Sequence, residues 1–157
     1  MNEEPTAGGG LLDEVNKRII EQLQQDGRRS YAGIAKVVGL SEAAVRQRVQ
    51  RLLEVGIMQI VAVTDPISVG FRRQAMIGIK ADGDLEEVAR KLAAVPEIDY
   101  VVVCAGSFDI IVELVCTDDD HLLRLMVNAI RSLPEIRSTE AFMYLKLVKQ
   151  TYSWGTR

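Results

Sequence analysis

The feature that most constrains the fold of this chain is an internal repeat in its second half. The segments DLEEVARKLAAVPEI (84–98) and HLLRLMVNAIRSLPEI (121–136) align at an offset of 38 residues, and both end in Pro-Glu-Ile. Each has helical spacing and lies between β-rich stretches, which span residues 73–81, 99–105, 109–117 and 138–149. The order β-α-β-β-α-β predicts a ferredoxin-like αβ-sandwich, with two helices on one face of a four-stranded antiparallel sheet.

The opposite face of that sheet has no segment of the chain left to cover it. Apolar residues alternate along the strands, so Met76, Val102 and Ile111, or their neighbours, are expected on this face. A soluble protein rarely exposes a large apolar face, and the pattern therefore predicts self-association.

Three short helices are predicted between residues 11 and 56. Apolar residues recur at helical spacing in each of them, and each ends at a glycine, namely Gly27, Gly39 and Gly56. Ser30 and Ser41 precede the second and third helices and can cap them. The β-rich stretch 57–65 is expected to form a strand that leaves this helical module.

The second and third helices have the spacing of a helix-turn-helix, because the link VGLS supplies a glycine for the bend and a serine cap. The second helix of such a pair lies in the DNA major groove and reads bases with its first turns. Arg46 and Gln47 can read guanine and adenine, whereas Arg48 and Arg51 better suit phosphates; spacing alone does not assign each arginine. The candidate DNA-binding residues are Ser30, Tyr31, Ser41, Glu42, Ala44, Arg46, Gln47, Arg48 and Arg51.

The distribution of charge favours the DNA-binding interpretation over a merely solvated helical surface. The net charge is −3, but residues 28–51 contain six basic residues and one acidic residue, a local +5 that leaves −8 for the rest. A basic patch on an acidic chain is typical of a local nucleic-acid interface.

The remaining composition excludes several classes of protein. Apolar residues make up 48 % of the chain, enough for a core. The two cysteines lie in apolar runs and the single histidine has no clustered metal ligands, which argues against disulfides and a structural zinc. The start MNEEPTAGGG does not resemble a signal peptide, and no apolar run is long enough to span a bilayer. We therefore expect a soluble cytoplasmic protein.

The stretch VVVCAGSFDIIVEL (101–114) joins two predicted strands through an unusual turn. A hairpin needs the glycine, and Asp109 is a common turn former, but a turn alone does not require Phe108. This turn is therefore either a plain glycine hairpin or part of a binding site.

The stretches LDEVNKRIIEQLQQDGR, YAGIAKVVGLSEAAVRQRVQRLLEVGIM and AGSFDIIVELV, in this domain order, resemble the Lrp/AsnC family of feast/famine transcription regulators over residues 11–150. The resemblance implies an α+β protein with an N-terminal winged-type helix-turn-helix domain and a C-terminal ferredoxin-like βαββαβ domain that binds amino acids. It also implies homodimers formed through the sheets, often assembled into octamers, in a bacterial or archaeal cytosol and associated with the nucleoid. No cofactor is expected.

With this resemblance, we expect a flexible tail over residues 1–10, a helix-turn-helix domain over 11–63, a linker over 64–71 and an effector-binding and oligomerisation domain over 72–152.

The resemblance also assigns an effector site to the turn. Gly106, Ser107, Phe108 and Asp109 match the family's Gly-x-aromatic-Asp, and Ser138 and Thr139 supply the hydroxyls of the last strand. Asp109 would accept from the ligand's ammonium, and N–H groups near Gly106 and Ser107 would bind its carboxylate. Phe108 would wall the ligand's side chain or pack at a subunit contact. Ala141 replaces an expected second hydroxyl, which indicates a ligand less polar than asparagine or one bound elsewhere.

Three functions are compatible with these features. The first is a DNA-binding regulator that responds to an amino acid, and the second is an architectural DNA-binding oligomer that senses no effector. The third, an enzyme, would have to use Cys104, Asp109, Glu113 or His121, and these residues form no catalytic motif. We therefore predict that the protein is not an enzyme.

Overall fold

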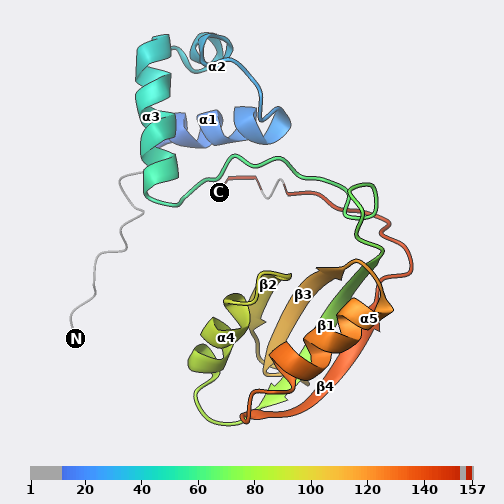
Figure 1. The fold of residues 1–157 in the computed structure, drawn as a ribbon. Helices are drawn as coiled ribbons and strands as arrows, with labels where there is room; N and C mark the ends of the chain where they lie inside the picture. The colour runs from blue at the N-terminus through green and yellow to red at the C-terminus, as the bar shows by residue number, and fades with distance from the viewer. Residues whose placement is uncertain (1–11, 153–154, 157) are drawn as a thin grey trace, which may run out of the picture. The chain divides into compact units, whose positions relative to one another are not determined.

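The computed structural model describes residues 12–152 and 155–156, and the tail predicted over residues 1–10 lies outside them. The described residues form two compact units (Figure 1). One contains residues 12–62, 149–152 and 155–156, and the other contains residues 63–148. None of the described helices has the length and apolar character needed to cross a membrane.

The first unit is built from the three predicted helices, α1 (Glu14–Gln25), α2 (Tyr31–Val38) and α3 (Glu42–Glu54). Ser30 caps α2 by accepting from the Gly33 N–H at 3.1 Å, and Ser41 caps α3 through Ala44 at 3.2 Å. Both predicted caps are confirmed. A shared core joins the helices and consists of Ile19, Leu23, Ile34, Ala35, Val38, Val45 and Val49.

The strand predicted over residues 57–65 is wrong, because the described chain has no strand before Arg73. Ile57 and Met58 donate their N–H groups to the carbonyl of Leu52, which closes the end of α3. A β-strand needs a hydrogen-bonded neighbour, and no described strand pairs with this segment. Ile60 and Val61 are exposed, with 46 % and 68 % of their surface accessible.

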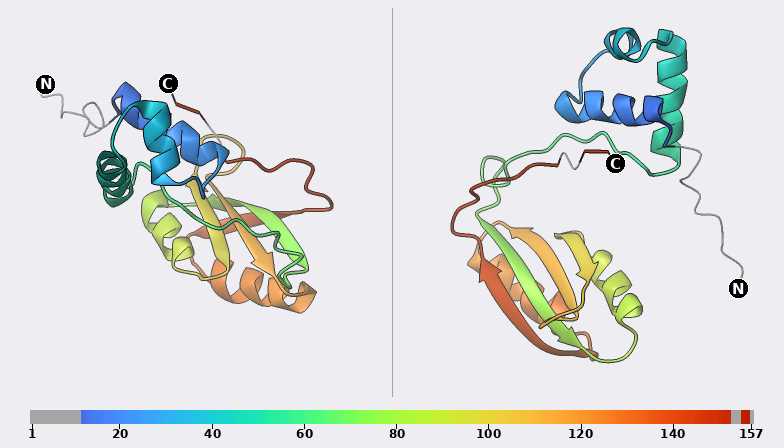
Figure 2. Two further views of the ribbon diagram at one scale, coloured as in Figure 1. Left: turned by 90° about the horizontal axis from the view of Figure 1, so that it is seen from above. Right: turned by 180° about the vertical axis from the view of Figure 1, so that it is seen from behind.

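The second unit confirms the predicted order of elements. It contains β1 (Arg73–Ala81), α4 (Leu85–Ala93), β2 (Ile98–Val103), β3 (Ile110–Cys116), α5 (Asp119–Arg124) and β4 (Ile136–Met143). The strands form one antiparallel sheet in the order β2-β3-β1-β4, with both helices on one face (Figures 1 and 2). Two details differ from the prediction, since α5 continues as a π-helix over Leu125–Ile130 and β4 ends at Met143 rather than at residue 149.

The two faces of the sheet differ as the alternation predicts. Toward the helices lie buried side chains, which include Ile77, Ile79, Ile110, Val112 and Leu114, packed on Val88, Leu92 and Ile130. Pairing places Met76 opposite Phe142, and Ile111 opposite both Gly78 and Val102. These residues therefore share the face that carries no helix, which the right-hand view of Figure 2 shows.

The Pro-Glu-Ile repeat has the same structural role in both copies. Glu97 lies 3.5 Å from Nε2 of His121, and Glu135 lies 2.7 Å from Nζ of Lys91. Each glutamate also accepts a backbone hydrogen bond from a strand or strand end, from Val115 and Asp82 respectively. The repeat thus fixes the end of each helical segment against the sheet.

Candidate DNA-binding and effector sites

The outward face of α3 carries the side chains predicted to read bases. Val45, Val49 and Leu52 are buried in the unit, whereas Arg46 and Gln47 are exposed. Arg46 pairs with Glu42 at 2.9 Å, and its guanidinium carbon lies 5.0 Å from the centre of the Tyr31 ring. The structure thus brings together three predicted residues from α2 and α3.

Arg48, which we predict to suit a phosphate, makes contacts with the start of α1. Its Nη1 donates to Oδ2 of Asp13 at 2.7 Å and to Oδ1 of Asn16 at 3.0 Å, so it joins α3 to the start of α1. Asp13 is also the N-cap of α1, and its pKa is lowered first by the Asn16 backbone N–H and then by Arg48. Sequence reasoning missed Asp13, although an aspartate before a helical pattern is a cap signal.

The remaining predicted DNA-binding residues lie at the exposed edges of α2 and α3. Ser30 and Ser41 use their hydroxyl oxygens as cap acceptors, which leaves each hydroxyl proton available for donation. Ala44 is half-buried near the start of α3. Arg51 is exposed and lies 3.9 Å from the carboxylate of Glu54, so it remains accessible to a phosphate.

The turn between β2 and β3 is held by a set of backbone and side-chain bonds centred on Asp109. The Asp109 N–H donates to Ile79 O at 2.9 Å, and its carbonyl accepts from Cys104 N at 2.9 Å. Its Oδ2 accepts from the Ala81 N–H at 3.0 Å. Gly106 has φ +156°, a conformation that favours glycine. One carboxylate oxygen of Asp109 is therefore engaged by the main chain.

Phe108 packs directly on the backbone of β1. A Cβ placed on Gly78 would lie 2.6 Å from the Phe108 ring, so only glycine accommodates the ring here. The ring also makes an edge contact with Phe142, with centroids 6.0 Å apart and planes at 78°. Phe108 thus belongs to the apolar sheet face, and the sequence held no signal that Gly78 would seat it.

Ser138 and Thr139 lie at the start of β4, opposite Lys80 and Ile79. Because Asp109 contacts the same end of β1, the structure brings the turn and the two hydroxyl residues to one end of the sheet. Successive residues of a strand point to opposite faces, so the two hydroxyls do not share a face. Thr139 accepts from Nε of Arg131 at 2.9 Å, and Ala141 lies opposite Ile77, further along β4.

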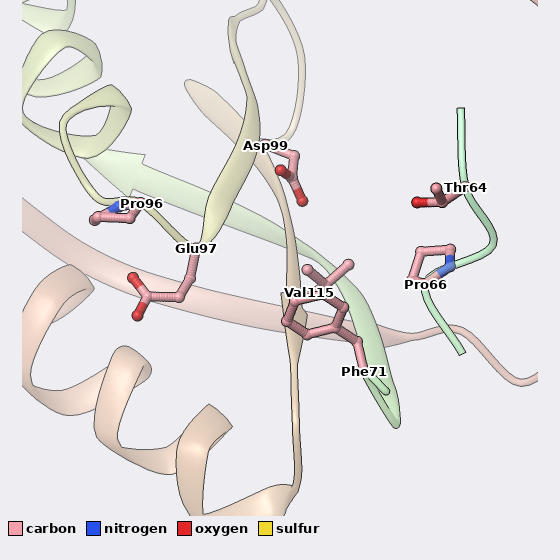
Figure 3. Close-up of a pocket in the computed structure, with 7 residues that line it drawn as sticks. All are labelled: Thr64, Pro66, Phe71, Pro96, Glu97, Asp99 and Val115. Atoms are coloured by element: carbon pink, nitrogen blue, oxygen red, sulfur yellow. The ribbon is translucent and has the colours of Figure 1, made fainter. Parts of the chain in front are cut away.

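A separate pocket of about 290 Å³ lies between the segment before β1 and the edge of the sheet (Figure 3). It contains none of the predicted site residues. Two carboxylates line it, Glu97 and Asp99, and the pKa of Asp99 is raised by burial and then by the nearby Glu113 charge. The other lining residues are Thr64, Pro66, Phe71, Pro96 and Val115.

The cysteine and histidine considered for catalysis contact neighbouring groups of the fold. Cys104 donates its thiol to Phe108 O at 3.2 Å, and His121 lies beside Thr117 and Glu97. Cys116 is fully buried, and burial raises the pKa of its thiol to about 11. Over residues 12–152 and 155–156, no three His, Cys, Asp or Glu side chains are grouped so as to hold a metal ion.

Two family models match this chain. The family model for the AsnC-type helix-turn-helix domain matches residues 12–53. A second model from the AsnC regulators, described as a C-terminal dimeric alpha+beta barrel domain, matches residues 71–157. The chain belongs to the Lrp/AsnC family. The resemblance stated from the sequence motifs is therefore confirmed, and so is the pairing of a helix-turn-helix domain with an α+β domain.

Relatives within the Lrp/AsnC family match almost the whole chain. The HTH-type transcriptional regulator FL11 of Pyrococcus furiosus is 35 % identical over 144 residues, which cover 90 % of this chain and 95 % of FL11. The structure of AsnC from Escherichia coli covers 90 % of this chain and 97 % of its own, with TM-score 0.75 and 26 % identity. The regulator NMB0573 of Neisseria meningitidis, solved as an L-Met complex, covers 90 % and 95 %, with TM-score 0.77 and 25 % identity.

Proposed function

We propose that this transcriptional regulator of the AsnC family binds DNA sequence-specifically and that a small amino acid changes its DNA affinity or its assembly. The observation that carries the proposal is the outward face of α3. There Arg46 and Gln47 are exposed beside the capped N-terminus of the helix, while the apolar side of α3 is buried. A helix presented in this way can enter the major groove.

Arg46 and Gln47 are the residues that we assign to base contacts. Arg46 is held over the half-buried Tyr31 and beside the exposed Glu42, and these contacts restrict the Arg46 side chain without burying it. Ser30, Tyr31, Ser41 and Arg51 can donate to phosphates on either side of the groove. Arg48 is assigned a positioning role, because its guanidinium fixes α3 against Asp13 of α1.

The effector site is proposed at the end of the sheet where the Gly106–Asp109 turn meets the start of β4. Asp109 uses Oδ2 for the Ala81 N–H, so Oδ1 is the oxygen assigned to the ammonium of the ligand. The L-Met complex of NMB0573 supports an amino acid as the class of ligand, since that protein has the same fold. Two copies of the chain would pair through their open sheet faces, and four such dimers would form an octamer.

The proposal is tested by a fluorescence-anisotropy titration of the full-length protein on the DNA upstream of its own gene. The titration is run at two salt concentrations, with and without a pool of the twenty amino acids. We expect tight binding that weakens with salt, because each phosphate contact contributes about 0.9 to the slope of log K against log salt. A shift caused by the pool supports effector sensing, and no preference over random DNA contradicts the regulatory assignment for this promoter.

One observation favours a second candidate, an architectural DNA-binding oligomer that senses no amino acid. Asp109 already satisfies a backbone N–H at the end of β1, so the turn has a structural reason to exist without a ligand. Specific binding that ignores every amino acid, including each tested singly at high concentration, would favour this candidate over the sensing regulator.

A further inference from the structure

A polar pocket of about 390 Å³ lies where the last helical segment turns into β4. Its size falls within the range of roughly 300–1,000 Å³ typical of small-molecule sites. It is lined by two arginines, two hydroxyl-bearing residues and one aliphatic residue, namely Arg131, Arg137, Ser138, Thr139 and Ile136. Such a lining suits a small anion far better than an apolar molecule.

Arg131 is positioned to receive an anion from outside the chain. Its Nε donates to the Thr139 hydroxyl at 2.9 Å, which orients the guanidinium. Within residues 12–152 and 155–156 it forms no ion pair with a carboxylate. Its Nη groups therefore remain available, and a guanidinium fork binds a carboxylate through two parallel hydrogen bonds.

Arg137 is brought to the pocket by an irregularity of the sheet. Lys80 pairs with Ser138 and Ala81 pairs with Ile136, so Arg137 is the extra residue of a β-bulge. A bulge redirects a side chain out of the regular alternation and is common beside functional sites. Arg137 forms an ion pair with Asp82, with Nε 3.2 Å from Oδ2, while 57 % of the arginine side chain remains accessible.

Asp109 connects this bulge to the proposed effector turn. Its Oδ2 accepts from the N–H of Ala81, the β1 residue at which the register shifts. The turn over residues 106–109 and the two-arginine pocket therefore lie at the same end of the sheet, on the β3 side and the β4 side of β1. In this arrangement Asp109 stays a candidate acceptor for an ammonium group at that end of the sheet.

We infer that the pocket binds a molecule with two carboxylates and that the effector is an acidic amino acid. Two guanidinium groups match two carboxylates, whereas the NH₂ of a side-chain amide would find no acceptor on either guanidinium. The binding of the acid stands on the pocket alone. Its identification as the effector rests on the proposed function. Ala141 does not line the pocket, so the absence of a hydroxyl at position 141 does not argue against an acidic ligand in this pocket.

The inference is tested by isothermal titration calorimetry on the full-length protein in a buffer free of phosphate and sulfate. The ligands are L-glutamate, L-aspartate, glutarate, L-glutamine and L-methionine, with inorganic phosphate as a further probe. We expect glutamate or aspartate to bind about tenfold or more tightly than glutamine, because charge-assisted bonds to a carboxylate are stronger than bonds to an amide. Glutarate has both carboxylates of glutamate but no ammonium group, so weaker binding of glutarate would show that the protein contacts the ammonium.

Variants locate the site. Arg131→Gln should weaken glutamate binding about tenfold or more, and Arg131→Lys should recover only part of it, because lysine lacks the planar fork. Thr139→Val, which removes the acceptor that orients Arg131, should weaken it as well. Arg90→Gln, an exposed arginine on α4, is the matched control and should bind as the unchanged protein does.

The inference is overturned if no acid binds, if glutamine or phosphate binds as well as glutamate, or if Arg131→Gln and Arg90→Gln behave alike. The same preparations are titrated with DNA, which separates this failure from that of the proposed function. DNA binding that responds to a neutral amino acid, with no binding of glutamate, would refute the acidic effector and leave the sensing regulator standing. Glutamate binding by a protein that binds no specific DNA would support the acid-binding pocket and refute the sensing regulator.

Discussion

At the scale of single residues, the contact between Phe108 and Gly78 makes a sharp prediction. A methyl group at position 78 would meet the Phe108 ring at 2.6 Å, and the atoms it meets include the ring carbon next to Cβ, so the whole ring must move. Gly78→Ala should lower the free energy of unfolding by about 1–3 kcal/mol, the usual cost of overpacking. Urea unfolding followed by circular dichroism measures this change.

The Phe108→Ala background supplies the control for Gly78→Ala. If the clash with the ring is the cause, the same substitution should cost little or nothing once the ring is absent. The two single variants and the double variant form a cycle whose coupling energy isolates this contact. Equal costs in both backgrounds would mean that Gly78 is required for a reason other than Phe108.

Asp13 makes the stability of the first unit depend on pH. Its pKa lies below its ordinary value of 3.8, first because the Asn16 N–H donates to it and then because Arg48 does. A carboxyl whose pKa is lower in the folded state stabilises that state above its unfolded pKa and loses this effect as the pH falls through its folded pKa. Asp13→Asn keeps a cap but cannot ionise, so its free energy of unfolding should approach that of the unchanged protein in acid.

The measurement for Asp13 is the difference in free energy of unfolding between the two proteins from about pH 6 down to about pH 2, the range in which aspartates titrate. Arg48→Gln provides the control, because it removes the cation and leaves the carboxyl and its backbone donor in place. It should shrink the pH-dependent difference without abolishing it. A difference that stays constant with pH would show that Asp13 acts as a cap alone.

At the scale of elements, α3 carries side chains on two faces with separate predicted roles. Gln47 is exposed, and removing its amide should weaken specific DNA binding by about 1–3 kcal/mol if it reads a base. Arg48 binds Asp13 and Asn16 of the first unit, so Arg48→Gln should mainly lower stability. Anisotropy titrations and thermal unfolding of both variants test this division, with Gln25→Ala on α1 as the matched control. If Arg48→Gln loses DNA affinity and the Gln47 variant does not, then Arg48 and not Gln47 contacts the DNA.

The elements that could be predicted from the sequence are those whose signals are local. Ser30 and Ser41 cap their helices within three residues, so the helix-turn-helix follows from neighbouring residues alone. The repeat over residues 84–98 and 121–136 likewise fixed the order of strands and helices, because each copy contains its own apolar spacing and its own proline. The Asp109 turn was predicted from the glycine between two apolar runs, and the family motif added its expected effector role, but its bond to Ala81 was not foreseen.

The features that escaped prediction depend on pairing between distant residues. The stretch 57–65 has the composition of a strand, but a strand also needs a neighbour, and composition does not supply one. Arg137 lies in a bulge that is set by the register between β1 and β4. Hydrophobic alternation predicts which face a residue of a strand occupies, but it does not predict where the register shifts. The π-helix at Leu125–Ile130 similarly has no signal in the apolar spacing.

At the scale of the whole molecule, the open sheet face is the surface through which we propose that copies of the chain assemble. Tyr100 and Phe142 lie on this face with 62 % and 44 % of their surface accessible, beside the half-buried Met76 and Ile111. The family model that matches residues 71–157 is described as a dimeric domain. A second copy placed face to face would cover these side chains, and a stable dimer typically covers about 800 Å² on each partner.

Ile111→Asp should therefore convert the protein from an oligomer to a monomer. Ile111 lies at the middle of the open face, paired with Gly78 and Val102, so a carboxylate there would lose its hydration when two sheets meet. Leu123→Asp is the matched control, because Leu123 is 61 % exposed on α5, which covers the other face of the sheet. Sedimentation velocity at several protein concentrations should show a smaller species for Ile111→Asp only. If Leu123→Asp dissociates the protein and Ile111→Asp does not, then the helical face, and not the open sheet, joins the subunits.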